Sequence, residues 1–164
     1  MTKEKIVVLD FGSQYAHLIA KRFRMLGYYS EIAQPQADLS TFEGAKGVVF
    51  SGGPASIYDA NAPKFNSDIL SLNIPILGLC YGHYVVQQGY NGKVEKAAVG
   101  EFGFAKLNFN KSVKSPLFEG IEDNQQVWMS HQDGVTKLGD GFEVVGATKD
   151  CPFAATQNLD KKRF

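Results

Sequence analysis

The chain is poor in the residues that mark several special classes of protein. It contains only two cysteines, Cys80 and Cys151, and three histidines in 164 residues. Two cysteines are too few for the disulfide framework of a small secreted protein, and the scattered histidines show no metal-ligand spacing. We therefore expect no metal centre and a reducing, cytoplasmic environment.

The sequence also lacks a charge surplus and a long apolar run. Its 17 Lys+Arg are balanced by 17 Asp+Glu, so charge favours neither nucleic acid nor a membrane surface as a partner. No run of about 18 apolar residues is long enough to span a bilayer. The N-terminus, MTKEKIVVLDFG, becomes acidic too soon for a secretory signal. Length and the 44% hydrophobic content fit one compact domain over residues 1–164.

Short apolar segments alternate with amphipathic ones in the first half of the chain. This alternation favours an α/β fold with a mostly parallel open sheet and helices on both faces, as in flavodoxin-like proteins. Strands are predicted within 5–10, 28–34, 45–54 and 74–80, and helices within 15–27, within 65–72 and after Cys80. Helical spacing in the first helix assigns one face to the core, formed by Tyr15, Leu18, Ile19, Phe23 and Leu26.

The pattern changes after about Gly92. From there on, turn signals separate segments that resemble strands, and no helical periodicity is evident. We predict an antiparallel or mixed C-terminal extension of the same domain, built from residues 93–109, 125–130, 142–148 and 153–157.

The segment GLCYG places Cys80 between two glycines, where a predicted strand meets a predicted helix. Ligands of open parallel sheets bind at the carboxyl ends of the strands, which is where Cys80 falls. Gly78 and Gly82 leave room for the tight turn typical of a nucleophile elbow. The helix N-terminus is expected to lower the pKa of the thiol. We predict that Cys80 is a nucleophile; the alternative is a small core residue.

A second glycine pair, in SGGP at 51–54, follows the neighbouring apolar run. Two glycines let backbone amides approach a ligand closely. The amide of Gly53, together with that of Tyr81, is a candidate oxyanion hole for a tetrahedral intermediate. Taken alone, Gly-Gly-Pro is more often a plain turn.

A cysteine nucleophile also requires a base, and the three histidines are the candidates. His17 is predicted to be solvated on the polar face of its helix. His83 is expected to point away from the sulfur, and His131 is predicted to lie in a polar loop that can line a pocket. The residues by themselves therefore predict a nucleophilic thiol, Cys80, but do not assign the base that it requires.

Seven segments carry a family resemblance, in order: VVLDFGSQYAHLIAKRFRMLG, VVFSGGPASIYD, PILGLCYGH, GEFGFAKL, VWMSHQDGV, ATKDCPFAA and KKRF. They resemble the class I glutamine amidotransferase (glutaminase) domain of GMP synthases over essentially the whole chain. The resemblance implies hydrolysis of glutamine through a cysteinyl thioester. It also implies transfer of ammonia to an ATP-pyrophosphatase (synthetase) domain or subunit, which aminates XMP to GMP. No cofactor is implied for the glutaminase; ATP and Mg are implied only for the synthetase.

The resemblance also implies roles for single residues. Cys80 matches the nucleophile, and the amides of Gly53 and Tyr81 match the oxyanion hole. Residues that match the walls of the glutamine site are Gly103, Phe104, Ser130 and His131. Tyr84 stands where the family usually has a substrate-holding glutamine, and Gln132 is a milder departure. Both imply a rearranged pocket or weaker glutamine binding.

A His-Pro-Glu stretch, which holds the catalytic histidine and its orienting glutamate in the family, shortly follows a segment like KKRF. The 164 residues contain no such stretch. The segment FAATQNLDKKRF is predicted as a hairpin whose second strand has barely begun, with its ladder unpaired. We therefore expect an incomplete domain of a longer protein, with weak or no activity alone.

Two other functions stay open. One is a non-catalytic module that binds or regulates a synthetase partner. The other is a different cysteine hydrolase on the same elbow, although relatives of that kind often have histidine where Tyr81 stands. A His-Pro-Glu stretch in the native sequence beyond Phe164 favours the glutaminase over the regulatory module.

Overall fold

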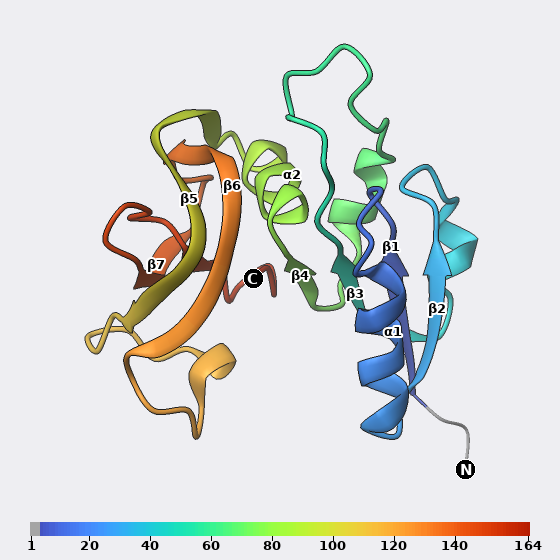
Figure 1. The fold of residues 1–164 in the computed structure, drawn as a ribbon. Helices are drawn as coiled ribbons and strands as arrows, with labels where there is room; N and C mark the ends of the chain where they lie inside the picture. The colour runs from blue at the N-terminus through green and yellow to red at the C-terminus, as the bar shows by residue number, and fades with distance from the viewer. Residues whose placement is uncertain (1–3) are drawn as a thin grey trace.

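The computed structural model describes residues 4–164 and contains two four-stranded sheets that lie side by side (Figure 1). Sheet A is parallel, with strand order β2-β1-β3-β4, and sheet B is antiparallel, with order β6-β5-β7-β8. The strands of sheet A are β1 (Lys5–Leu9), β2 (Tyr29–Ala33), β3 (Ala45–Phe50) and β4 (Ile76–Gly78). The strands of sheet B are β5 (Lys93–Phe109), β6 (Gln125–Lys137), β7 (Glu143–Ala147) and β8 (Ala155–Gln157).

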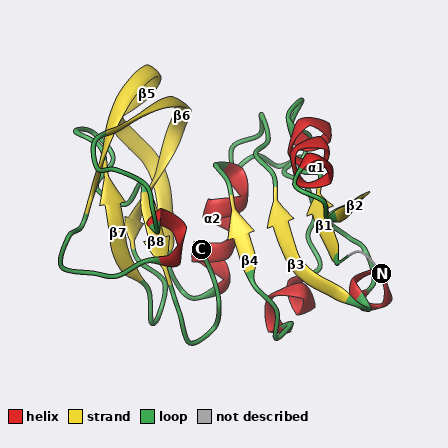
Figure 2. Cartoon of the chain, turned by 90° about the horizontal axis from the view of Figure 1, so that it is seen from below, coloured by secondary structure: helices red, strands yellow, loops and turns green. Residues whose placement is uncertain are grey.

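Helices cover both faces of sheet A, as predicted. The helices are α1 (Ala16–Met25) and α2 (Tyr81–Gly89), with 3-10 turns η1 (Leu39–Phe42), η2 (Ser67–Ser71) and η3 (Pro116–Phe118). Alternate residues of the central strands separate the two sides: Val8 faces α1, whereas Val7 and Leu9 face α2 and η2. Helix α2 lies between the two sheets (Figure 2). Within the described residues, no helix combines the length and the apolarity that a membrane span needs.

The predicted core face of α1 is wrong in part. Tyr15 and Leu26 are 58% and 72% exposed, while Ala16 and Ala20 are fully buried. The two alanines allow the helix to lie close to the sheet, where Ile6, Val8 and Val49 complete a small core. Small side chains at the contact thus outweigh the larger apolar residues on which the prediction depended.

Sheet B follows the predicted extension, with one error that matters for the site. Strand β6 continues to Lys137, so His131 lies in a strand and not in the predicted loop. The ladder between β5 and β6 shifts register between Lys96 and Glu101, and after this shift Glu101 lies directly opposite His131. A cross-strand pair of this kind places both side chains on the same face of the sheet.

The prediction that the hairpin FAATQNLDKKRF, residues 153–164, leaves its ladder unpaired is also wrong. Asn158 and Arg163 form an antiparallel bridge, and the segment then pairs with β4, where the Phe164 amide donates to the Ile76 carbonyl at 2.9 Å. Arg163 is buried, and its guanidinium donates to the carbonyls of Leu70, Leu72 and Ile74 at 2.6–2.8 Å. Tertiary pairing with sheet A therefore supplies partners that a local hairpin does not have.

Candidate active site

A sharp turn carries Cys80 between β4 and α2. Cys80 has φ 52° and ψ −111°, a backbone conformation that L-residues rarely adopt. Such a residue costs about 1–3 kcal/mol and persists only where its surroundings fix it. Here the Leu79 amide donates to the Phe50 carbonyl at 2.9 Å, and the Gly82 amide donates to the Ser51 carbonyl at 3.1 Å. The strained elbow is thus anchored on β3 from both sides of the cysteine.

The two glycines that flank the elbow leave no space for a side chain. A Cβ atom on Gly78 would lie 2.6 Å from the Gly82 carbonyl oxygen. A Cβ atom on Gly82 would overlap the Phe50 carbonyl oxygen and lie 2.6 Å from the Phe50 Cβ. Because the atoms they meet include backbone atoms, the elbow requires glycine at both positions.

The charge environment of the thiol differs from the prediction. Cys80 as a whole residue is exposed, but partial desolvation of its thiol raises the pKa above its ordinary value, and the Asp133 carboxylate adds to this rise. A hydrogen bond from the Tyr81 amide acts in the opposite direction but is the smaller effect. The prediction of a lowered pKa is wrong, because it considered the helix N-terminus without the desolvation by the groove.

The SGGP loop packs directly on the elbow. A Cβ atom on Gly52 would be 3.4 Å from the Cβ of Cys80, and one on Gly53 would overlap the carbonyl oxygen of Phe11. Within residues 4–164, no acceptor is hydrogen-bonded to the Gly53 amide. The Tyr81 amide is directed at the thiol. The two amides named as an oxyanion hole therefore lie on segments that meet at Cys80; their role stays a prediction.

Six of the eight predicted site residues border one groove of about 1420 Å³. The groove runs between the elbow edge of sheet A and strand β6. Its predicted members are Gly53, Cys80, Tyr81, Tyr84, Ser130 and His131. Gly103 and Phe104, the other two predicted residues, are not among the described residues that line the groove. Phe102 and Trp128 line it instead. The binding roles of all these residues stay predictions.

Tyr84 connects α2 to sheet B at the floor of the groove. Its side chain is buried, and its hydroxyl donates to the Asp133 carbonyl at 2.6 Å. Burial strongly raises the pKa of Tyr84, so the phenol is neutral. Its single proton is already used, and Tyr84 can only accept a hydrogen bond from a ligand.

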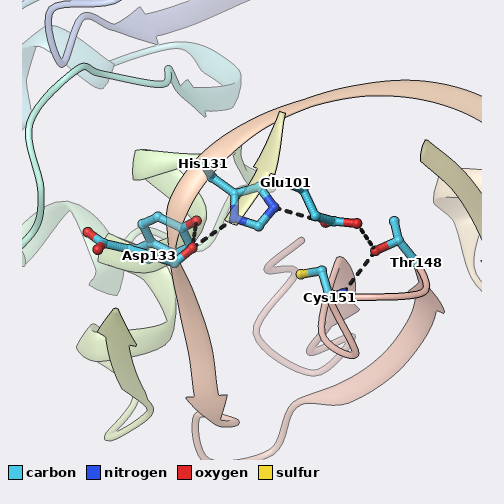
Figure 3. A network of polar contacts seen from close by, with 6 residues as sticks. Glu101, His131, Asp133, Thr148 and Cys151 are labelled. Carbon is cyan, nitrogen blue, oxygen red and sulfur yellow. Dashed lines mark hydrogen bonds and ion pairs between the residues drawn. The ribbon is translucent and has the colours of Figure 1, made fainter. Parts of the chain in front are cut away.

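A buried polar network forms the wall behind His131 (Figure 3). Nδ1 of His131 lies 2.9 Å from the Asp133 carbonyl, and Nε2 lies 3.0 Å from Oε2 of Glu101. Oε1 of Glu101 accepts from the Thr148 hydroxyl at 2.6 Å, and that hydroxyl accepts from the Cys151 amide at 2.9 Å. The network fixes the orientation of the His131 ring.

Sequence reasoning missed Glu101, Thr148 and Asp133 as members of this site. One signal was available for Glu101: within EFGFAKL, it shares strand alternation with Gly103 and Ala105, on the inward side of β5. A carboxylate at an inward position needs a partner, since an unpaired buried charge is costly. That partner, His131, is 30 residues away and is not visible from spacing alone.

None of the three histidines is hydrogen-bonded to the Cys80 thiol in the described part of the chain. His17 is exposed, as predicted. His83 borders the groove, but its Nε2 is buried without a hydrogen-bond partner among residues 4–164. Burial lowers the pKa of His83 to about 4, so the ring is neutral at pH 7. The general base is therefore not assigned to a described residue.

Comparison with known proteins adds sequence relatives. Residues 7–164 match the family model described as glutamine amidotransferase class-I. A probable glutamine-hydrolysing GMP synthase of Leptospira interrogans is 42% identical over 161 residues, 98% of this chain and 27% of that protein. A GMP synthase of Lactobacillus delbrueckii subsp. bulgaricus is 46% identical over 163 residues, 98% of this chain and 31% of that protein. The chain thus spans less than a third of these curated relatives.

Solved structures with the same fold give a consistent result. A protein from Thermoplasma acidophilum, described as a putative GMP synthase subunit, has a TM-score of 0.85 and 27% identity, covering 99% of this chain and 82% of that chain. A glutamine amidotransferase from Thermotoga maritima shares the fold at a TM-score of 0.79 and 17% identity, covering 99% of this chain and 74% of that chain. With a family model that matches almost every residue, the chain belongs to the class-I glutamine amidotransferase family.

Proposed function

We propose that this chain is the glutaminase part of a GMP synthase, which hydrolyses glutamine and delivers ammonia to a synthetase. The observation that carries the proposal is the elbow: Cys80 at φ 52°, facing a groove that Gly53 and Tyr81 also border. The similarity to GMP synthases along the chain supports the choice of this reaction among those of the family.

The proposed chemistry has two steps. The Cys80 thiolate attacks the side-chain amide carbon of glutamine, and the amides of Gly53 and Tyr81 donate to the oxyanion of the tetrahedral intermediate. The intermediate collapses to a thioester, while the protonated amide nitrogen leaves as ammonia. Water then attacks the thioester, releasing glutamate and restoring the thiol.

The base that removes the thiol proton is proposed from the family resemblance. In the family it belongs to the His-Pro-Glu stretch that follows a segment like KKRF, which the 164 residues do not include. A thiol whose pKa burial raises is mostly protonated at pH 7, so it depends on such a base.

The substrate pocket is proposed to lie between Cys80 and strand β6. Ser130 and His131, which border the groove, are proposed to hold the amino-acid end of glutamine, chiefly through backbone groups. Tyr84 replaces the glutamine usual in the family and offers only an acceptor, which suits an ammonium or amide N–H of the substrate.

The synthetase partner is proposed to be an ATP-pyrophosphatase domain or subunit that uses ATP and Mg to aminate XMP; the glutaminase step itself needs no cofactor.

Three large aromatic residues are exposed to solvent on one side of β5 and β6: Phe102, Phe104 and Trp128 are 70%, 74% and 66% exposed. Phe104 and Trp128 are in edge contact, with ring centroids 4.9 Å apart. An exposed aromatic cluster beside the groove suits a protein interface.

A covalent labelling experiment tests the proposal. The folded chain is treated with a diazoketone analogue of glutamine, with and without excess L-glutamine, and the labelled residue is mapped by mass spectrometry. We expect selective labelling of Cys80 that L-glutamine suppresses and the same excess of L-asparagine does not. Cys80→Ser serves as the control that removes the label.

Absence of protected labelling in a folded chain would contradict a competent glutamine pocket. A non-catalytic module that binds a synthetase partner is the second candidate; it is favoured by Tyr84, which stands where the resemblance implies a substrate-holding glutamine and whose proton is donated to the Asp133 carbonyl. Labelling of Cys80 that L-glutamine does not suppress would point to a reactive elbow with a different substrate.

A further inference from the structure

Three potential metal ligands from distant parts of sheet B converge beside the groove (Figure 3). They are Glu101 on β5, His131 on β6 and Cys151 in the loop before β8, and their ligand atoms all lie within 4.8 Å of one another. The side chains of Glu101 and His131 are only 8% and 10% exposed. An oxygen, a nitrogen and a sulfur donor thus meet in a site that is largely shielded from water.

The contacts of His131 require a positive charge, from a proton or a metal ion, between its ring and Glu101. The Asp133 carbonyl can only accept, so Nδ1 of His131, 2.9 Å away, carries a proton. In the neutral ring, Nε2 then has a lone pair, and it lies 3.0 Å from a carboxylate oxygen of Glu101. Two lone pairs at this distance repel each other unless a proton or a metal ion lies with them.

Outer contacts hold two of the donors in the way that metal sites require. The bond from Nδ1 to the Asp133 carbonyl orients the imidazole so that Nε2 is the free ligand atom. Thr148 donates to Oε1 of Glu101 and leaves Oε2 for the centre of the cluster. The same hydroxyl accepts from the Cys151 amide, which links the loop to the carboxylate.

We propose that Glu101, His131 and Cys151 form a binding site for a soft divalent cation of the zinc type, with water as the fourth ligand. Zinc accepts carboxylate oxygen, imidazole nitrogen and thiolate sulfur as ligands, usually in a tetrahedron, and a site with three protein ligands leaves the fourth position to water. The three residues lack a local motif because they are far apart in the chain, which is why cysteine and histidine spacing predicted no metal.

The distances suit such an ion after adjustments of different size: His131 and Glu101 are already close together, whereas the Cys151 sulfur, within 4.8 Å of both, moves toward them by up to about 1 Å. Bonds of about 2.0–2.1 Å to nitrogen and oxygen place these ligands roughly 3.3 Å apart in a tetrahedron. The His131–Glu101 distance of 3.0 Å then opens by about 0.3 Å. An access route also exists, since His131 and Cys151 border both the main groove and a smaller cavity of about 270 Å³.

Binding requires the thiol to release its proton. Burial, together with Glu101, raises the pKa of Cys151 to about 11, so the free thiol is protonated at pH 7. A metal ion displaces that proton, and its affinity should therefore rise with pH. The bound ion would join β5, β6 and the loop before β8 behind His131, and the proposal does not depend on the glutaminase reaction.

The test uses a Cys80→Ser chain, so that the groove thiol contributes no signal. Zinc is titrated against a chromophoric chelator, and Co²⁺ is added separately to detect a thiolate-to-metal charge-transfer band. We expect one zinc per chain, a Co²⁺ thiolate band, and a melting temperature that rises with zinc concentration. Cys151→Ala should abolish the band and remove the rise in melting temperature.

A matched pair of threonine variants tests the outer contacts. Thr148→Val removes the donor to Glu101 and should weaken zinc binding on the order of 10- to 100-fold. Thr136→Val removes a similar donor to Glu95, at 2.7 Å on the exposed side of β6, and should leave zinc binding unchanged. Circular dichroism confirms that each variant is folded.

Two results would overturn the proposal. The first is a folded Cys80→Ser chain that takes up no stoichiometric zinc, which would leave a proton as the cation between His131 and Glu101. The second is zinc binding that Cys151→Ala and Thr148→Val do not weaken, which would place the ion elsewhere. Neither result bears on glutamine labelling at Cys80.

Discussion

The most direct perturbation of the elbow is Gly82→Ala. The new Cβ would overlap the Phe50 carbonyl oxygen and lie 2.6 Å from the Phe50 Cβ. That carbonyl accepts from the Leu79 amide and belongs to β3, so it cannot turn aside without breaking the elbow itself. Restoring an ordinary contact of 3.4 Å to the Phe50 Cβ alone requires α2 to move by about 0.8 Å away from β3, and the overlap with the carbonyl oxygen makes this a minimum.

This displacement determines the expected magnitudes. Overpacking of this kind costs about 1–3 kcal/mol, which at about 2–4 °C per kcal/mol lowers the melting temperature by roughly 2–12 °C. Because Cys80 directly precedes α2 as its N-cap residue, the thiol shifts with it. A displacement of nearly 1 Å should slow Cys80 labelling by the glutamine analogue on the order of 10- to 100-fold.

Gly89→Ala is the matched control at the other end of the same helix. Its Cβ would meet only the Cδ1 end of Leu70, a flexible side chain that can rotate. Both variants gain the same helix propensity, up to about 1 kcal/mol, so the difference between their melting temperatures isolates the clash with β3. Equal melting temperatures and equal labelling rates for the two variants would refute the argument that Gly82 is required for steric reasons.

Three further predictions concern buried groups. Arg163→Met should lower the free energy of unfolding by at least about 3 kcal/mol, because three carbonyls each lose a donor at about 1–3 kcal/mol. Urea denaturation measures this loss, and the control Lys161→Met, at an exposed position, should change the free energy of unfolding little. Burial lowers the pKa of His83 from 6.5 to about 4, so the unfolded chain binds the proton more readily in that range. Stability should therefore be full above pH 6.5 and fall by up to roughly 3 kcal/mol as the pH drops to about 4, and His83→Gln should lack this fall. At neutral pH, Cys80 should react with iodoacetamide faster than Cys151, whose pKa is raised to about 11 by burial and by Glu101; equal rates by mass spectrometry would contradict this.

The parts of the structure that were predictable depend on local signals. The β-branched runs predicted the parallel sheet, and Gly78 and Gly82 on either side of Cys80 predicted the elbow, because both features are determined by neighbours in the chain. The same local argument failed for the thiol: the hydrogen bond from the Tyr81 amide lowers the pKa of Cys80, but desolvation, to which Asp133 on β6 adds its charge, outweighs it. Local sequence predicted where the sulfur is and not the electrostatic environment around it.

The hydrogen-bond network behind His131 could not be predicted from local sequence either, because it depends on the pairing of two strands. Glu101 meets His131 only because the β5–β6 ladder shifts register after Lys96. A different register would place the carboxylate opposite another residue, and a shift of one would turn it to the other face. The alternation of β5 indicates an inward carboxylate, but its partner follows from a pairing that forms across 30 residues of chain.

Helix α2 connects the elbow, which the sequence predicted, with the groove wall on sheet B, which it did not. Gly82 fixes its N-terminus on β3. The Tyr84 hydroxyl and the Gln87 side chain attach the helix to Asp133 and Thr156 of sheet B, and Gln87 also accepts from the Gly139 amide in the loop between β6 and β7. The nucleophile and the opposite wall of the groove are therefore held by one rigid element. Because α2 carries both contacts, any change that moves it from β3 alters the thiol position and the groove wall together.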